Sequence, residues 1–217
     1  MMQKKGIIFD LDGTLLESMG MWGNIGNRYL LSQGISPPPD LRETLWTMDL
    51  AEACVYMVHT FGLSQTPQEA VASIHQMIRD SYRYEIPCKP GASALLDALF
   101  AANLPICLAT ATDREIFMPA LERLDIAKYF RFTHSCAEAG QSKRNPRVYL
   151  DCADFLRLPP EDLIVVEDTF HAANTAKQAG FTVIGVRDSY AASDWEGLAR
   201  ICDRFVDSLE ELLCTKS

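Results

Sequence analysis

Six short apolar runs, each five or six residues long, recur along the chain with helical stretches between them. In chain order they read GIIFD, PICLAT, FRFTH, LIVVED, TVIGV and RFVDS. Continuous apolar runs bounded by turn residues are typical of strands that are buried on both faces of a parallel sheet. Because strand, helix and strand repeat, and such crossovers are right-handed, the sequence predicts an α/β fold with a doubly wound, open parallel sheet.

Several segments between these runs carry helix start and stop signals. Residues 91–103 end near Asn103, residues 113–125 open on Asp113 as a capping residue, and residues 169–180 stop at Gly180. The sequence DSLEELL at 207–213 predicts a short last helix.

The region from residue 17 to residue 87 departs from the alternation because it holds no convincing strand. Residues 21–34, 41–62 and 67–85 all pattern as helices, and the proline-rich sequence SPPPD at 36–40 predicts a loop between two of them. We therefore expect a core of residues 1–16 and 88–217, with a small α-helical cap domain at 17–87 inserted after the first strand.

Composition limits the possible partners and surroundings. The chain has 217 residues and a formal net charge of −9. This charge argues against sequence-independent binding of nucleic acid and against attraction to an anionic membrane. The seven cysteines form no CxxC pair, which predicts reduced thiols. No signal-like segment or membrane span is visible, so we expect a cytoplasmic protein.

Acidic and hydroxyl side chains gather at the predicted strand ends. Asp10, Thr110, Glu167 and Asp168 all fall there, and ligands of open α/β sheets bind at the carboxyl ends of the strands. A single strand-end aspartate is more often a helix cap or a loop hydrogen-bonder. An EF-hand loop is excluded by spacing, since it needs glycine at its sixth position and Gly13 is fourth from Asp10.

A cluster of Asp10, Asp12, Glu167 and Asp168 would be electrostatically unfavourable. Two unit charges about 4 Å apart repel by about 4 kcal/mol at an effective dielectric of about 20. A hard divalent cation removes that repulsion, and Mg²⁺ prefers carboxylate oxygens while leaving coordination positions free for a phosphate. The acidic cluster therefore predicts Mg²⁺ and, through it, a phosphoryl group.

Four motifs in order carry a resemblance to a known family. They are DLDGT at 10–14, Thr110 at the end of an apolar strand, Lys143 ahead of a helix, and the acidic pair of VVEDT. With them the chain resembles the haloacid dehalogenase superfamily, in its phosphatase and phosphomutase branch with a helical cap after the first motif. The resemblance covers essentially the whole chain.

The resemblance implies three catalytic residues. Asp10 would be the nucleophile that forms an aspartyl-phosphate. Asp12 would protonate the leaving oxygen and then deprotonate the attacking water. Lys143 would balance the charge of the moving phosphoryl group. The true dehalogenases of the superfamily lack the second aspartate, so Asp12 disfavours halide displacement.

The resemblance also implies the binding residues. Thr110, the amide of Ala111 and Lys143 would hold phosphate oxygens. The ligands of Mg²⁺ would be Asp10, Asp12 through its backbone carbonyl, Glu167 and Asp168. Thr112 is a weaker candidate, since it either caps a helix or touches substrate.

Three positions depart from the family pattern. Arg144 follows the lysine where a Pro-x-Pro-like turn is usual, and Ala172 stands where a glycine is usual. Trp22 stands where the sugar phosphomutases carry a cap histidine, which weakens the mutase reading. Trp22 and Arg42 have no assigned role in the cap, since helical packing and a solvated face are the ordinary explanations for such residues.

The sequence therefore predicts a Mg²⁺-dependent phosphatase that hydrolyses a small phosphomonoester. Two alternatives stay open, a sugar-phosphate mutase and a non-catalytic sensor of a phosphorylated ligand. The expected partner is a small phosphorylated metabolite, and the expected state is a monomer or a weak homodimer. The sequence does not identify the substrate.

Overall fold

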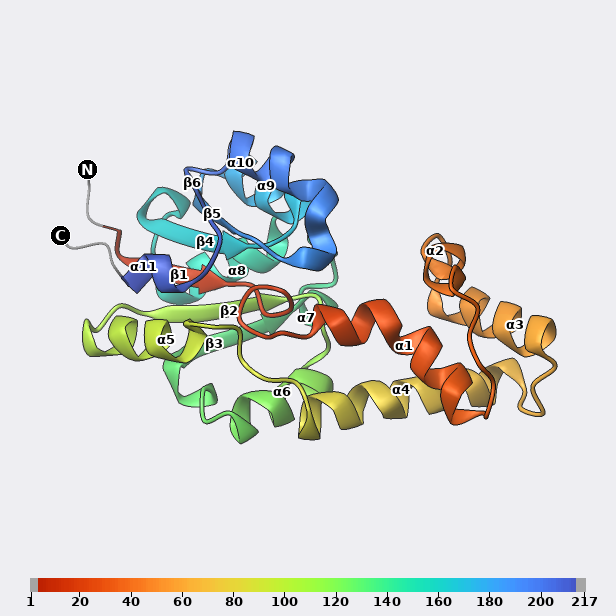
Figure 1. The fold of residues 1–217 in the computed structure, drawn as a ribbon. Coiled ribbons are helices and arrows are strands. Elements are labelled where there is room, and N and C mark those ends of the chain that lie inside the picture. The colour runs from red at the N-terminus through yellow and green to blue at the C-terminus, as the bar shows by residue number, and fades with distance from the viewer. Residues whose placement is uncertain (1–3, 214–217) are drawn as a thin grey trace. The chain divides into compact units, whose positions relative to one another are not determined.

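The computed structural model describes residues 4–213, and these contain one six-stranded parallel sheet (Figure 1). The strands lie side by side in the order β3-β2-β1-β4-β5-β6. They are β1 (Gly6–Phe9), β2 (Ile106–Thr110), β3 (Phe130–Ser135), β4 (Leu163–Glu167), β5 (Thr182–Val186) and β6 (Arg204–Val206). Each strand falls on one of the six predicted runs, which confirms the predicted α/β class.

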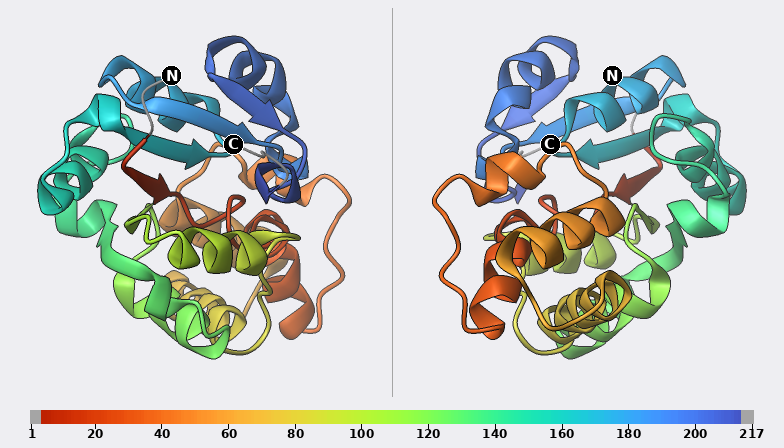
Figure 2. Two further views of the ribbon diagram at one scale, coloured as in Figure 1. Left: turned by 90° about the vertical axis from the view of Figure 1, so that its left-hand side faces the viewer. Right: turned by 90° about the vertical axis from the view of Figure 1, so that its right-hand side faces the viewer.

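Helices cover both faces of the sheet (Figures 1 and 2). Every residue of β1 and β2 is buried, as their uninterrupted apolar sequences predict. The α-helices of this part of the chain are α5 (Ala92–Ala101), α6 (Arg114–Arg123), α7 (Cys136–Ala139), α8 (Arg147–Leu156), α9 (Phe170–Gln178), α10 (Trp195–Ile201) and α11 (Glu210–Leu213). Short 3-10 helices lie at η1 (Ala127–Tyr129), η2 (Pro160–Asp162) and η3 (Ser189–Asp194).

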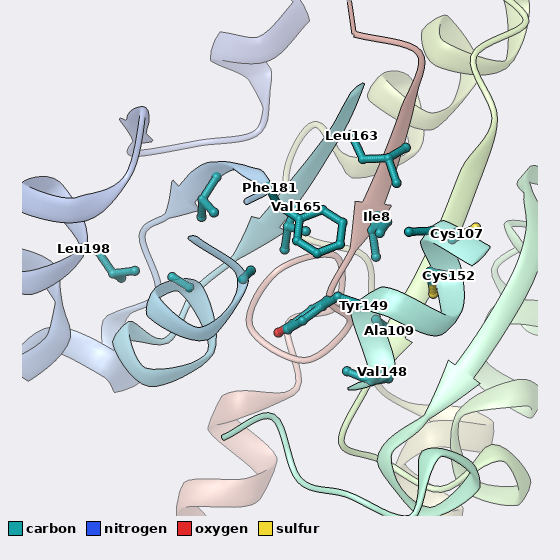
Figure 3. Packing of buried hydrophobic residues seen from close by; sticks show 14 residues of the cluster. Ile8, Cys107, Ala109, Val148, Tyr149, Cys152, Leu163, Val165, Phe181 and Leu198 are labelled. Atoms are coloured by element: carbon teal, nitrogen blue, oxygen red, sulfur yellow. The ribbon is translucent and has the colours of Figure 1, made fainter. Parts of the chain in front are cut away.

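One apolar core cluster lies between one face of the sheet and helices α8, α9 and α10 (Figure 3). Ile8 and Val165 project from the strands toward Tyr149 and Cys152 of α8. The ring of Tyr149 also meets Phe181 edge to face, with centroids 6.2 Å apart. Each buried side chain of this size stabilises the fold by about 1.5–3 kcal/mol. This packing fixes the position of α8 beneath the sheet.

The topology reverses direction between β1 and β4. The chain runs outward from β1 to β2 and β3, then returns to β4 and runs the other way to β5 and β6. In sheets of this kind the ligand crevice lies at the carboxyl ends of the two strands at such a switch point. Asp10 directly follows β1, and Glu167 ends β4. The amide of Asp10 also donates to the carbonyl of Val166 at 3.0 Å, so the two strand ends are held together.

The chain divides into two compact units, residues 4–18 with 86–213 and residues 19–85. The second unit contains four α-helices within its described residues. They are α1 (Met19–Ser32), α2 (Leu41–Leu45), α3 (Leu50–Phe61) and α4 (Pro67–Tyr84). The proline-rich sequence 36–40 connects α1 and α2, as predicted.

The prediction of one continuous helix over 41–62 was wrong. The chain turns between α2 and α3, because Asp49 starts a new helix. Its side chain accepts the amide of Glu52 at 2.8 Å, and the side chain of Glu52 accepts the amide of Asp49 at 3.0 Å. This reciprocal capping box satisfies two amides that a continuous helix would bond to its own carbonyls.

Asp113 begins α6 as predicted, but its side chain makes no capping hydrogen bond. The backbone carbonyl of Asp113 instead accepts the amides of Ile116 and Phe117. Six cysteines of the described residues are free, and Cys214 lies outside those residues. No helix between residues 4 and 213 has the length and apolar character needed to cross a membrane.

The two chain segments that lead from the first unit to the second and back lie side by side in the first unit. Leu16 forms an isolated antiparallel bridge with Cys88. The amide of Glu17 donates to Pro87 at 3.0 Å, and the amide of Lys89 donates to Leu15 at 2.8 Å. The departing and returning segments are therefore hydrogen-bonded to each other.

Candidate active site

Five residues predicted from the sequence lie buried at the carboxyl ends of the strands or in the following loops. They are Asp10, Thr110, Lys143, Glu167 and Asp168, and none is more than 6% exposed. Lys143 comes from the loop between α7 and α8, and the others come from β1, β2 and β4 or the residues directly after them. Charged side chains are seldom buried to this degree without a partner.

Lys143 lies between two carboxylates. Its ammonium group donates to Oδ1 of Asp10 and, at 2.5 Å, to Oε1 of Glu167. Burial lowers the pKa of Lys143, but the charges of Asp10 and Glu167 outweigh this effect and leave its pKa above the ordinary value. The lysine is therefore a fixed cation beside Asp10.

Asp10, Glu167 and Asp168 could hold a metal ion. Each offers a carboxylate oxygen, and these atoms all lie within 4.8 Å of one another. Oδ2 of Asp10 and Oδ2 of Asp168 are buried and accept no hydrogen bond. Buried acceptors without a partner are unfavourable and rare, and a hard divalent cation such as Mg²⁺ would supply the partner they lack.

The pKa values of the acidic residues reflect the same crowding. Burial raises the pKa of Glu167 to about 7, and the nearby charge of Asp10 acts in the same direction. Burial and the charges of Asp10 and Glu167 also raise the pKa of Asp168 well above its usual range. A bound cation would reverse these effects, since it favours the ionised carboxylates.

Asp12 is half-buried, and both its carboxylate oxygens accept hydrogen bonds. The hydroxyl of Ser18 donates to Oδ1 at 2.6 Å, and the hydroxyl of Thr112 donates to Oδ2 at 2.6 Å. The amide of Thr112 also donates to the hydroxyl oxygen of Thr110 at 3.1 Å. Thr112 thus joins the end of β2 to Asp12, a role that neither of its two sequence-based interpretations included.

Tyr149 is a site residue that the sequence analysis missed. Its hydroxyl donates to Oε1 of Glu167 at 2.6 Å, on the same oxygen that Lys143 binds. Burial and the neighbouring Glu167 raise the pKa of Tyr149 well above its ordinary value, so it stays a neutral donor. The sequence could have drawn attention to Tyr149, because this residue belongs to the buried face of α8 together with Val148 and Cys152.

Other sequence candidates lie exposed or within the second unit. Ala111 is exposed directly after β2, and Arg144 is exposed directly after Lys143. In the helical unit, the indole of Trp22 donates to the hydroxyl of Tyr82 at 3.0 Å. The guanidinium of Arg42 lies 5.8 Å from the ring centre of Trp46. Packing inside the helical unit therefore accounts for Trp22.

The chemical groups at the strand ends form a set suited to nucleophilic catalysis. Asp10 is a carboxylate beside a fixed ammonium group, and carboxylates act as covalent nucleophiles. Asp12 is less buried and can exchange a proton with solvent or with a bound molecule. Asp10 and Asp12 are separated by one residue, Leu11, in the segment that follows β1.

Comparisons with known proteins place the chain in a family. The family model described as haloacid dehalogenase-like hydrolase matches residues 7–186. The chain is 23% identical over 176 residues to a phosphorylated carbohydrates phosphatase of Thermotoga maritima, covering 81% of this chain and 82% of that one. It is 26% identical over 230 residues to a phosphoglycolate phosphatase of Salmonella typhi, and this match covers 96% of this chain and 91% of that one.

Among solved structures, the fold is similar to that of a Thermotoga maritima protein provisionally named as a beta-phosphoglucomutase. The TM-score is 0.83 at 22% identity, and the match covers 98% of this chain and all of the other. This likeness concerns the fold.

Proposed function

Because this chain belongs to the haloacid dehalogenase-like hydrolases and is a phosphoric monoester hydrolase, we propose that it works with Mg²⁺ and through an aspartyl-phosphate on Asp10. The observation that carries the proposal is the buried group formed by Asp10, Lys143, Glu167 and Asp168. One carboxylate there is paired with a lysine and keeps an unpaired oxygen next to a potential metal site.

In the first step a carboxylate oxygen of Asp10 attacks phosphorus, and the bond from phosphorus to the ester oxygen breaks. The buried ammonium of Lys143 stabilises the charge on the transferring group, because it is already oriented and needs no reorganisation. The hydroxyl of Thr110 and the amide of Ala111, which follow one another at the end of β2, would bind the phosphoryl oxygens.

Asp12 moves the protons in both steps. Its carboxyl group would protonate the departing ester oxygen and then take a proton from the water that hydrolyses the aspartyl-phosphate. The hydroxyls of Ser18 and Thr112 hold its two oxygens in place. Products are an alcohol and inorganic phosphate.

Asp10, Glu167 and Asp168, with the backbone carbonyl of Asp12, would hold the magnesium ion. When bound, the ion offsets the negative charge of these carboxylates and of the phosphoryl group. Lys143 and Tyr149 both donate to Oε1 of Glu167 and would orient its carboxylate for this role.

We propose a small phosphorylated metabolite as the substrate, and residues 19–85 as a cap that selects it. The names of the two curated relatives, which refer to phosphorylated carbohydrates and phosphoglycolate, support this class. A sugar-phosphate mutase is the second candidate, because of the fold likeness to the protein named as a beta-phosphoglucomutase. Against it, Trp22 occupies the position of the mutase histidine and bonds to Tyr82.

Phosphate release from a panel of phosphorylated sugars and short phosphorylated acids, with Mg²⁺ and with EDTA, tests the proposal. We expect release with Mg²⁺ and a loss of at least about a hundredfold with EDTA, because the crowded carboxylates need a cation. Activity that survives complete metal removal would contradict the metal assignment. Phosphate transfer within a sugar, without free phosphate, would favour the mutase. Binding without turnover would favour a sensor.

Magnesium affinity is expected to depend on pH. The pKa of Glu167 is raised to about 7, and a protonated carboxyl group is a poor metal ligand. Binding measured by calorimetry should therefore weaken as pH falls from about 8 to about 6, by up to about tenfold per pH unit below the pKa. Tyr149→Phe removes a donor to ionised Glu167 and should move this dependence to higher pH. Equal affinity at both pH values would contradict the assignment of Glu167.

A further inference from the structure

Lys89 makes a partly buried three-way contact outside the four sequence motifs. Its ammonium group donates to the carbonyl of Gly13 at 2.7 Å, to Oδ2 of Asp188 at 2.8 Å and to the carbonyl of Arg187 at 3.1 Å. The side chains of Lys89 and Asp188 are 10% and 1% exposed. An ammonium group has three donor protons, so this one has an acceptor for each.

The contact joins two loops that are not neighbours in the sheet. Gly13 lies in the loop after β1, and Arg187 and Asp188 directly follow β5. Strand β4, which ends in Glu167 with Asp168 next, lies between β1 and β5 in the sheet. Lys89 therefore connects the loops on either side of the strand that supplies two of the proposed metal ligands.

The loop that Lys89 holds is the one that carries Asp12. Gly13 has a φ of +82°, in the left-handed region that favours glycine, and its amide donates to Leu16 at 3.0 Å. The backbone amide of Lys89 donates to Leu15 in the same loop at 2.8 Å. Lys89 thus fixes this loop at two points, one of them the carbonyl group of Gly13, the residue that follows Asp12.

Asp188, which accepts a hydrogen bond from Lys89, is itself held by two further hydrogen bonds. Oδ1 of Asp188 accepts the amide of Tyr190 at 2.9 Å, and the carbonyl of Asp188 accepts the indole N–H of Trp195 at 2.8 Å. Asp188 therefore offers Lys89 a fixed anchor on the β5 side.

We propose that Lys89 is a positioning residue for catalysis, which holds the backbone at Gly13, the residue after Asp12, so that the Asp12 carboxyl group meets the leaving oxygen. The proposal rests on the proposed function, because it assigns Asp12 the proton transfers. The alternative is an ion pair with Asp188 that stabilises the fold and has no effect on the reaction.

The double variant Lys89→Met with Asp188→Leu separates these roles. It replaces the buried pair by apolar side chains, so no unpaired buried charge remains and the protein is expected to stay folded. The hydrogen bond to Gly13 is lost. We expect kcat to fall by about tenfold to a hundredfold, as for a small misplacement of a catalytic group, while KM changes less than about threefold.

A folded double variant with kcat within about twofold of the native value would overturn the proposal. Should the double variant not fold, Lys89→Met is assayed at a temperature where circular dichroism shows it folded, and the same limits apply. Lys89→Arg keeps a cation with donors and should recover at least about a third of the native kcat. A folded Lys89→Arg that is as slow as Lys89→Met would also count against positioning through Gly13.

A matched control uses the ion pair of Lys5 with Asp162, whose atoms are 2.8 Å apart at the opposite ends of β1 and β4. Lys5→Met with Asp162→Leu should leave kcat unchanged. The native enzyme is assayed in parallel. Absence of native turnover would reject the proposed function, whereas normal native turnover with an unaffected Lys89 variant would reject only the role of Lys89.

Discussion

Replacing Asp10 by asparagine is expected to lower kcat for phosphate release by at least about 10⁴-fold without unfolding the protein. An amide oxygen is a far weaker nucleophile than a carboxylate, so no aspartyl-phosphate forms. The side chain keeps its shape, and its oxygen can still accept the hydrogen bond from Lys143. Phosphate release and thermal unfolding, measured on the same preparation, check both parts of this expectation.

Asp162→Asn is a suitable control for that variant. Asp162 is also a buried aspartate paired with a lysine, but it lies just before β4, at the other end of that strand from the site. Its replacement should leave kcat near the native value. Mass spectrometry after rapid acid quench should find phosphate on a peptide containing Asp10 in the native enzyme only. Near-normal turnover by Asp10→Asn would show that another residue is the nucleophile.

Asp12→Asn is expected to lower kcat by about 10²- to 10⁴-fold, the usual contribution of general acid–base catalysis. Its effect should depend on the leaving group. The phenolate of an aryl phosphate can leave without being protonated, so the loss of the acid should slow its first step little. Hydrolysis of the aspartyl-phosphate still needs the base and should remain slow. Rapid-quench kinetics should therefore show a burst of the phenol followed by slow turnover.

Thr112→Val provides the comparison for Asp12→Asn. It removes one of the two hydroxyl donors to Asp12 and keeps the side-chain shape. We expect a smaller loss than that of Asp12→Asn, because the carboxyl group remains. An equal loss by Asp12→Asn for aryl and alkyl phosphates, with no burst, would contradict its role as the acid and base.

The sheet could be predicted because each strand carries its own local signal. All six apolar runs became strands of one parallel sheet. Helices α7, α8 and α10 were not among the predicted segments, although the position of Lys143 ahead of a helix was noted. Helix α7 has only four residues, which is too few for a periodic pattern to emerge. Residues 41–62 show a different difficulty, because their helical pattern looked continuous although the capping box at Asp49 begins a new helix.

The candidate site was only partly predictable, for a different reason. Residues such as Asp10 and Glu167 could be found because parallel strands bring their carboxyl ends to one edge. Tyr149 could have been noticed on the buried stripe of α8, but only the fold shows that its hydroxyl reaches Glu167. Lys89 and Asp188 lie 99 positions apart, and no spacing rule relates them. Contacts of this kind depend on the packed structure rather than on local pattern.

The hydrogen-bonded crossing formed by Leu16, Glu17, Pro87 and Cys88 bears on how such a chain can change through evolution. The two ends of the helical insertion are already held together by the sheet-bearing unit, so closing the loop between them does not depend on the insertion's own fold. The entropy of closure grows only slowly with loop length. Insertions of different size or sequence could therefore be exchanged at this junction while the strands keep their register, and the selectivity proposed for residues 19–85 would then evolve independently of the reaction chemistry.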